Sequence, residues 1–516
     1  MRADVLQELN KTAARVREVD VQTPGVDQCE WLIDNAEAYA RIVKSIAGAK
    51  VSIRMSQLAF DGDCIAYGTD TSPDVSMAGM VAAAARERGV DIRILMNQTV
   101  LLDTVTPLRK WFASHAAKSI KVKGVSRFPQ LLHAKMIVVD DAELFLVGSP
   151  FVNGYWDDSR HAPTDSRRPM RELGGRPLHD VSVRLTGSPV IEAMTVFDDW
   201  WKTANGECEA EPDQPPRQVS DSVQHPRKTA PVHLASTRPG CSARAGQKEI
   251  LTACLDGISR ARSLIYIEHQ YLSSRPVVKA LAEAVDKNDE LELIVVLNQN
   301  PDITAYRRWQ NDRLSRSGLE GHPRVGVFSL WSATTRVGRI TAASQIFVHS
   351  KVMTIDDNWA MVGSANLDGV SLDSYGDDFA GPVARRLFRN IRNFDVNAIV
   401  RDGCDGVPSN GFVASLRSRL WAEHLGLHPR AVMERPASGW LPFWRTRAKQ
   451  NVLALDANNS RRRYRGSVLP YSSAPTPAKQ WTGLGIDTHN ESPVLQFNPG
   501  WMEVYLSPNW VRNMFL

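Results

Sequence analysis

Cysteine is scarce in this chain, and its few copies are not arranged in pairs. Six cysteines occur among 516 residues, and no two of them form the Cys-x-x-Cys spacing of zinc and redox motifs. They are Cys29, Cys64, Cys208, Cys241, Cys254 and Cys404. This scatter argues against a cysteine-based metal centre, and it implies no disulfide framework.

Long apolar runs are also missing. The longest candidate, residues 77–85, is ended by the charged residues 86–88, whereas a membrane-spanning helix needs about 20 apolar residues. The first residues lack the apolar core of a signal peptide. We therefore expect no signal peptide and no transmembrane helix. A cytoplasmic or peripheral membrane protein is the default, and non-classical export as an effector is left open.

The chain has little excess charge of either sign. Its formal net charge is +5, and 23% of its residues are charged against 43% hydrophobic, as in ordinary globular proteins. A bias this small over 516 residues is a weak indication of nucleic-acid binding, and it would equally suit an anionic membrane surface. The length predicts about two to four domains.

One short motif, His-x-Lys-x4-Asp, occurs twice. The copies consist of His133, Lys135 and Asp140, and of His349, Lys351 and Asp356. Each is followed by Gly-Ser, ending at Ser149 and Ser364. A single match arises by chance in about a few per cent of chains of this length. Two copies with matching surroundings are therefore not expected by chance.

The surroundings of the motifs repeat as well. Around the first copy we predict strands at 51–57 and 90–97 and helices at 77–88 and 188–203. Around the second copy we predict strands at 264–270 and 291–298 and helices at 276–287 and 411–426. A strand opening with Asp-Val follows each motif, at Asp180 and Asp395. This duplication predicts two tandem α/β lobes, each a mostly parallel or mixed sheet flanked by helices.

The amino-acid composition indicates where the domains begin and end. We predict a first lobe with an N-terminal helix at 1–205, a linker at 206–235, and a second lobe at 236–430. Residues 431–516 match neither lobe and are rich in Pro, Asn, Ser and aromatic residues. We expect an irregular C-terminal extension of unknown role there. A tail packed over the lobes is favoured over a membrane or partner surface.

The motif residues suit cleavage of a phosphodiester. On a strand, alternate side chains share a face, so the His and Lys of each copy point the same way. A neutral imidazole can attack phosphorus, a second can protonate the leaving oxygen, and Lys135 and Lys351 can hold the phosphoryl oxygens. The side chains of Ser149, Ser364 and Asn366 can add hydrogen bonds to the substrate.

Two aspartates occupy equivalent places after the motifs. Asp180 and Asp395 are the carboxylates expected to hold each histidine in its tautomer, with simple salt bridging as the alternative. Three further aspartates are candidates to replace Asp395 in that role, namely Asp373, Asp377 and Asp378. No metal-ligand spacing is visible, so we predict no metal and no cofactor.

These features resemble the phospholipase D superfamily, whose hallmark is a duplicated HxKxxxxD motif. Further matches are Gly-Tyr-Trp-Asp-Asp at 154–158 with His161, Leu-His-Asp at 178–180, Tyr-Ile-Glu-His-Gln-Tyr at 266–271, Gly-Ser-Ala-Asn-Leu-Asp at 363–368, and residues 416–426. Two departures stand out. His269 replaces the usual Asn of the family's IYIENQYF segment, and Gly-Ser-Pro-Phe in the first lobe lacks the Asn of GSxN.

The resemblance implies two lobes with the active site at their interface. It implies that His133 is the nucleophile and His349 the general acid, or the reverse. Lys135, Lys351 and Asn366 would bind phosphate. Asp140 and Asp356 belong to the motif, although at strand ends their role can be structural.

The implied activity is that of a phospholipase D. It would hydrolyse a glycerophospholipid to phosphatidic acid and a head-group alcohol through a phosphohistidine, with transphosphatidylation to an alcohol acceptor as a variant. A phosphatidyltransferase of the cardiolipin-synthase kind, a nuclease and an inactive membrane-binding scaffold are the alternatives. We expect a peripheral phospholipid membrane surface as partner, no nucleic acid, and a monomer, because both motifs lie in one chain.

Overall fold

The computed structural model describes most of the chain. The described residues are 29–68, 74–99, 102–127, 130–168, 175–204, 232–240, 246–379, 381–403, 411–457 and 463–471. The expected N-terminal helix and linker fall largely outside them, since residues 1–28 and 205–231 are not described.

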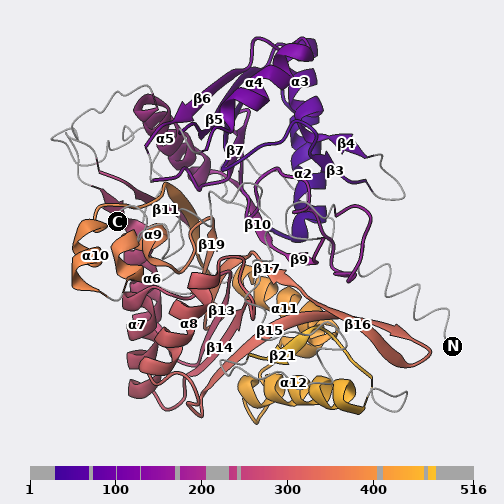
Figure 1. Cartoon of the computed structure of the whole chain (residues 1–516), viewed down its shortest axis with the longest axis vertical. Helices are drawn as coiled ribbons and strands as arrows, with labels where there is room; N and C mark the ends of the chain where they lie inside the picture. The colour runs from indigo at the N-terminus through magenta and orange to yellow at the C-terminus, as the bar shows by residue number, and fades with distance from the viewer. Residues whose placement is uncertain are drawn as a thin grey trace, which may run out of the picture.

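The first lobe is a seven-stranded sheet in the order β1-β10-β8-β7-β2-β5-β6 (Figure 1). Its strands are β1 (Cys29–Ile33), β2 (Ser52–Ser56), β5 (Asp91–Asn97), β6 (Lys121–Val125), β7 (Met136–Val139), β8 (Glu143–Leu146) and β10 (Val181–Thr186). Its helices are α2 (Asp34–Gly48), α3 (Met77–Arg88), α4 (Val105–Ser114) and α5 (Ser188–Thr203). Short strands β3 (Ile65–Ala66) and β4 (Val75–Ser76) form a separate ribbon.

The second lobe repeats this topology. The path β20-β19-β18-β13-β14-β15 follows the same order as β10-β8-β7-β2-β5-β6. Its strands are β11 (Val232–Arg238), β12 (Gln247–Lys248), β13 (Leu264–His269), β14 (Glu292–Leu297), β15 (Val325–Arg336), β16 (Arg339–Gln345), β18 (Lys351–Ile355), β19 (Trp359–Gly363), β20 (Asp395–Arg401) and β21 (Val468–Pro470). Its helices are α6 (Glu249–Arg260), α7 (Arg275–Lys287), α8 (Thr304–Arg316), α9 (Gly369–Leu372), α10 (Pro382–Leu387), α11 (Phe412–Leu425) and α12 (Trp440–Ala457).

Both sheets are mixed, which is one of the two expected arrangements. In the first sheet β2, β5 and β6 are parallel, while β7, β8, β10 and β1 add antiparallel neighbours. The second sheet has the same division. The antiparallel part arises because a tight turn, rather than a helix, joins each motif strand to the next strand.

One hydrophobic core joins the lobes. Along β7, Met136 and Val138 pack into a cluster that also holds Val352 and Val396 from the second sheet, whereas Ile137 and Val139 pack into a separate outer cluster. This two-residue alternation gives each sheet one face toward the other lobe and one toward its own helices. Trp200 of α5 and Trp421 of α11 are buried in the shared cluster.

The predicted boundaries need two corrections. The second lobe begins with β11 at Val232, inside the expected linker 206–235, because this strand pairs along β20. The described part of the C-terminal segment includes regular elements rather than only the expected irregular chain: α12 packs on the lobe, and β21 pairs with β15 (Figure 1). Residues 472–516 lie outside the described part of the chain.

Among the described residues, no helix combines the length and the apolar character needed to span a bilayer.

Candidate active site

Each motif begins where the chain crosses to the opposite lobe. The backbone N–H groups of His133 and Ala134 both donate to the carbonyl of Phe394, at 3.0 and 2.8 Å. In the other half, β17 (Phe347–Val348) pairs with β9 (Leu178–His179), and the N–H of His349 donates to the carbonyl of His179 at 2.8 Å. The motif histidines therefore precede the regular strands β7 and β18, rather than lying within them as predicted.

Each histidine is held by a carboxylate from the other lobe. His133 Nδ1 lies 2.8 Å from Asp395 Oδ1, and His349 Nδ1 lies 2.9 Å from Asp180 Oδ2. Because an ionised carboxylate only accepts hydrogen bonds, Nδ1 carries the proton and Nε2 keeps its lone pair. Asp373, Asp377 and Asp378 instead bind Lys248, Arg275 and Ser273, so the idea that one of them replaces Asp395 is wrong.

The two serines form hydrogen bonds with the aspartates that hold the histidines. The Ser149 hydroxyl donates to Asp180 Oδ2, and the Ser364 hydroxyl donates to Asp395 Oδ1 at 2.7 Å. Their hydrogens are thus engaged, and the expectation that they donate to substrate is corrected to a positioning role. The glycine before each serine is required by the closeness of the next strand. A Cβ on Gly148 would lie 1.8 Å from Asp180 Oδ1.

Both motif lysines are fully buried between the lobes. Lys351 Nζ donates to Gln270 Oε1 at 3.2 Å and to the carbonyl of His349. Lys135 Nζ makes no hydrogen bond within the described part of the chain. Burial, followed by the charge of Lys351, lowers the pKa of Lys135 to about 7. Burial lowers the pKa of Lys351 to about 8, against the opposing pull of Asp180.

The histidines are neutral in this environment. Burial, reinforced by Lys135, lowers the pKa of His133 to about 4, although Asp395 acts in the opposite direction. Burial and then Lys351 lower the pKa of His349 to about 3. Burial alone would raise the pKa of Asp395, but the contact with His133 outweighs it and the pKa is lowered. The arrangement therefore combines neutral imidazoles, ionised carboxylates and nearby cations.

The lobes differ at the residue after Gly-Ser-x. Asn366 is buried, and its side-chain oxygen has no hydrogen-bond partner among the described residues. The equivalent Phe151 packs against Tyr39 and Phe60 in the core. Nearby Asn153 bonds to backbone groups of Ile65 and Asp63, so the first lobe has no counterpart of Asn366.

The motif aspartates lie at the far ends of their strands from the histidines. Asp140 accepts the backbone N–H groups of Lys50, Val51 and Ser52, and Asp356 those of residues 262–264. Their grouping with the catalytic residues is therefore corrected. Each carboxylate fastens the end of its motif strand to the start of the neighbouring strand.

Sequence reasoning missed a second set of polar residues beside the site. Asp34, His161, His179 and Glu423 converge, and this set overturns the expectation that no metal-ligand cluster exists. His161 and His179 lie in segments that carry the family resemblance, but Asp34 and Glu423 had no sequence signal, because only folding brings them together. His269, which stands where the family usually has Asn, is fully buried and is paired with Lys351 across strands β13 and β18.

Family models match this chain over most of the two lobes. One, described as "Cardiolipin synthase, PLD-like domain", matches residues 42–150 and 254–379. Another, described as "Phospholipase D", matches residues 330–471. The chain belongs to the phospholipase D superfamily. The duplicated lobes and the paired His-Lys motifs described above agree with that membership.

Relatives within the superfamily are distant. Phospholipase D zeta 1 of Arabidopsis thaliana is 25% identical over 343 residues, which is 57% of this chain and 29% of that protein. Phospholipase D1 of Schizosaccharomyces pombe is 20% identical over 521 residues, which is 79% of this chain and 36% of that protein. The chain therefore spans only about a third of the length of these relatives.

Two solved structures align with this chain at low TM-scores. The phosphatidylserine synthase of Haemophilus influenzae aligns with a TM-score of 0.47 at 13% identity, covering 80% of this chain and 90% of that one. The phospholipase D family member Nuc of Salmonella typhimurium aligns with a TM-score of 0.24 at 18% identity, covering 34% of this chain and 95% of that one.

Proposed function

We propose that this superfamily member is a phospholipase D that hydrolyses the head-group phosphodiester of a glycerophospholipid. The observation that carries the proposal is the symmetric site. Two neutral imidazoles are each held at Nδ1 by a carboxylate of the opposite lobe, with two buried lysines alongside. Phosphoryl transfer needs in-line attack, protonation of the leaving oxygen and charge stabilisation, and this set supplies all three without further groups.

In the first step, His133 Nε2 attacks phosphorus and the bond from phosphorus to the head-group oxygen breaks. His349 gives a proton to that oxygen, so the alcohol leaves neutral and a phosphatidyl-histidine is formed. The negative charge of a bound phosphate raises the pKa of His349, which lets it carry that proton despite its low pKa in the free protein. Lys135, Lys351 and Asn366 hold the phosphoryl oxygens.

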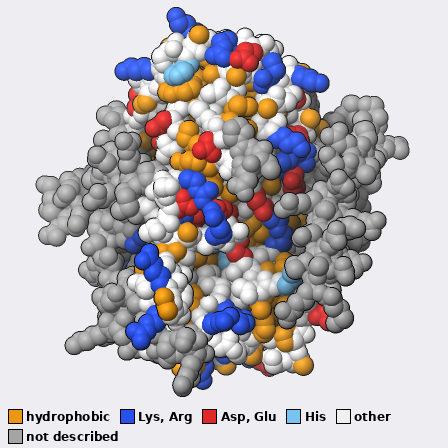
Figure 2. Space-filling view, turned by 90° about the vertical axis from the view of Figure 1, so that its right-hand side faces the viewer, with side chains coloured by type: hydrophobic (Ala, Val, Ile, Leu, Met, Phe, Trp, Pro, Cys, Tyr) orange, Lys and Arg blue, Asp and Glu red, His pale blue; other side chains and the backbone are white. Residues whose placement is uncertain are grey.

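In the second step, His349 takes a proton from water, and the oxygen of that water attacks phosphorus. The bond from phosphorus to His133 breaks and phosphatidic acid is released. An alcohol in place of water would give transphosphatidylation. The substrate is presented by a phospholipid membrane surface, to which the protein would bind peripherally as a monomer. Positive and negative side chains are interspersed on the face in Figure 2, without the continuous basic stripe that favours nucleic acid.

A substrate with an activated leaving group separates the two histidine roles. With phosphatidyl-p-nitrophenol, the leaving group needs no proton. His349→Asn should therefore release one equivalent of nitrophenol per enzyme and then stall as a covalent adduct. His133→Asn should release none. Head-group release from phosphatidylcholine vesicles should be lost in both variants, and full activity in either would disprove the proposal. A burst in His133→Asn instead would exchange the two roles.

A phosphatidyltransferase of the cardiolipin-synthase kind is the second candidate. The family model described as "Cardiolipin synthase, PLD-like domain" favours it, as does the Asn-Phe-Asp-Val-Asn run at 393–397. Phosphatidylglycerol vesicles distinguish the two candidates. Mass spectrometry of the products should find phosphatidic acid under the first proposal and cardiolipin under the second. Added ethanol would report transphosphatidylation as phosphatidylethanol.

A further inference from the structure

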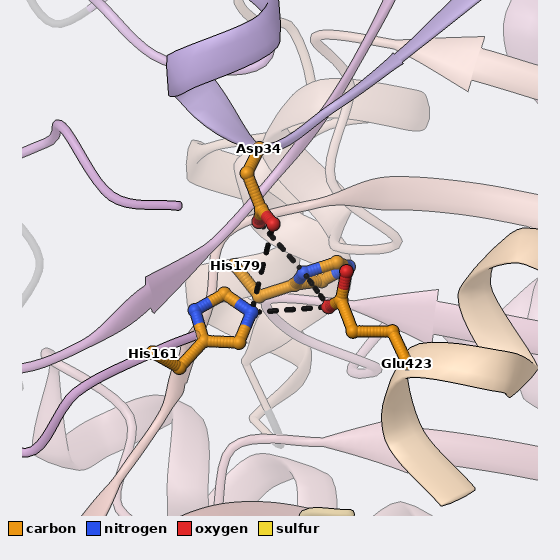
Figure 3. Close-up of side chains that lie close together, drawn as sticks. All are labelled: Asp34, His161, His179 and Glu423. Atoms are coloured by element: carbon orange, nitrogen blue, oxygen red, sulfur yellow. Dashed lines mark hydrogen bonds and ion pairs between the residues drawn. The ribbon is translucent and has the colours of Figure 1, made fainter. Parts of the chain in front are cut away.

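Four metal-ligand side chains meet in the interior beside the catalytic centre (Figure 3). Asp34 begins α2, His161 lies in the segment after Asp158, His179 ends β9, and Glu423 lies on α11. The side chains of Asp34, His161 and His179 are between 0% and 5% exposed, and that of Glu423 is 14% exposed. The first three belong to the first lobe and Glu423 belongs to the second.

These four side chains can each offer one ligand atom, with all four atoms within 4.8 Å of one another. His161 Nε2 lies 3.0 Å from Glu423 Oε1 and 3.7 Å from Asp34 Oδ2. His179 Nδ1 lies 2.9 Å from Asp34 Oδ1 and 3.1 Å from Glu423 Oε1. A tetrahedral zinc ion with bonds of about 2.0–2.1 Å places its ligands about 3.3–3.4 Å apart. The observed separations scatter around that value.

His161 Nε2 and Glu423 Oε1 are hydrogen-bonded to each other at 3.0 Å, whereas the atoms of Asp34 and His179 are close to their neighbours without being directed at them. Within the described residues, neither oxygen of Asp34 and neither ring nitrogen of His179 makes a hydrogen bond of acceptable geometry, although all four atoms are buried. Buried polar groups are otherwise almost always hydrogen-bonded. Short distances without hydrogen-bond directions are what ligand atoms show when they point to a common centre. Asp34 and His161 also hold left-handed backbone, with φ of 62° and 42°.

A second ring of carboxylates lies against both imidazoles; it is hydrogen-bonded to His161 and in close contact with His179. His161 Nδ1 lies 3.0 Å from Asp157 Oδ2, and His179 Nε2 lies 2.8 Å from Glu268 Oε1. Metal-binding histidines almost always donate their other ring N–H to such a group, which fixes the tautomer and strengthens the ligand nitrogen. Glu268 is held in turn by His424 Nε2 at 2.7 Å, so His424 belongs to this outer ring.

We propose that Asp34, His161, His179 and Glu423 bind one zinc ion at a structural site. Two nitrogens and two oxygens in a closed four-ligand set suit zinc, whereas calcium and magnesium take six or more oxygen ligands. The two carboxylates balance the charge of the ion. Four protein ligands leave no open position for catalysis. The ion links the two lobes next to Asp180. Asp180 follows His179 in the sequence and orients His349.

Metal analysis tests the site directly. Full-length protein purified without a polyhistidine tag should contain about one zinc ion per chain. After removal of the metal, titrated cobalt should give the visible absorption of a tetrahedral complex. His161→Gln and Glu423→Gln should lose both signals. His133→Asn removes a catalytic imidazole only and should keep them. Asp157→Asn removes an outer partner and should weaken zinc binding by roughly 10–100-fold.

X-ray absorption on the wild-type protein covers the case in which a variant fails to fold. The expected shell has four nitrogen or oxygen ligands at about 2.0–2.1 Å, two of them imidazoles. Wild-type protein that contains no metal and takes up neither zinc nor cobalt would overturn the proposal. So would metal that is lost in His133→Asn but kept in His161→Gln and Glu423→Gln, since the ion would then lie at the catalytic centre.

Discussion

At the scale of single residues, the site depends on carboxylates that fix histidine tautomers. Asp395→Asn keeps the size of the side chain but can present an N–H to His133 Nδ1, which would move the ring proton to Nε2 and block attack. We expect a loss of kcat of roughly 10²–10⁴-fold with little change in KM. Steady-state kinetics on mixed vesicles measures this. Asp286→Asn, whose side chain is 73% exposed on α7, is the control and should behave like wild type.

The pKa values set the pH profile of the free enzyme. With phosphatidyl-p-nitrophenol, whose leaving group needs no proton from His349, His133 has only to be neutral to attack, so kcat/KM should rise as pH increases through about 4, well below the 6.5 of an ordinary histidine. Lys135 and Lys351 must be charged to hold phosphate, so kcat/KM should fall as pH increases through about 7–8. An acid limb near the ordinary histidine value would contradict the buried, lysine-flanked environment of His133.

The motif aspartates should affect stability rather than chemistry. Asp140→Ala leaves three backbone N–H groups without their carboxylate and should cost about 1–3 kcal/mol, toward the lower end because Asp140 is partly exposed. The pKa of Asp140 is lowered, with the backbone hydrogen bonds outweighing burial. Its contribution is therefore present at neutral pH and is lost as pH falls through the folded-state pKa. Denaturant unfolding measures the cost.

Activity per folded molecule should stay near wild type in Asp140→Ala. A loss as large as that caused by replacing His133 would restore a catalytic role to Asp140.

At the scale of elements, each β-turn-β unit delivers its histidine and lysine to the interface. The strand after each motif must also pass close to the aspartate strand of its own lobe. Gly148→Ala puts a methyl group onto Asp180 and should displace that carboxylate from His349. We expect kcat to fall by at least about tenfold, since small misplacements of catalytic groups are costly.

A matched glycine separates this effect from a general cost of the added methyl. Gly48→Ala, at the end of α2, meets no atom within 4 Å and should be neutral or slightly stabilising. Vesicle hydrolysis and thermal unfolding of both variants make the comparison. Equal activity in the two would show that the Gly148–Asp180 approach is not critical.

At the scale of the whole molecule, the lobes share both a core and a site. Trp421 on α11 is fully buried in the cluster that joins the sheets, so Trp421→Ala should cost about 3–5 kcal/mol. Because the core is continuous, calorimetry should show one transition that moves to lower temperature as a unit. Two separated transitions, with only one of them shifted, would mean that the lobes unfold independently.

Much of this organisation could be predicted from local sequence. Helix α3 and helix α5 begin and end where their periodicity placed them. Strand β10, which begins just after Asp180, and strand β20, which begins at Asp395, follow the motifs as expected. Period-two and helical patterns are local properties, because they reflect burial of one face of one element. The choice between a mostly parallel and a mixed sheet stayed open, since pairing direction depends on neighbours distant in sequence.

The candidate reacting groups were thus predicted from the sequence alone: two histidines, two lysines and two aspartates in duplicated surroundings. Only the tertiary structure decided which groups touch. It pairs His133 with Asp395 and His349 with Asp180 across the lobes, and it gathers Asp34, His161, His179 and Glu423 into one cluster. The physical reason is that contacts between distant segments arise from packing two sheets on a common core, which no local pattern encodes.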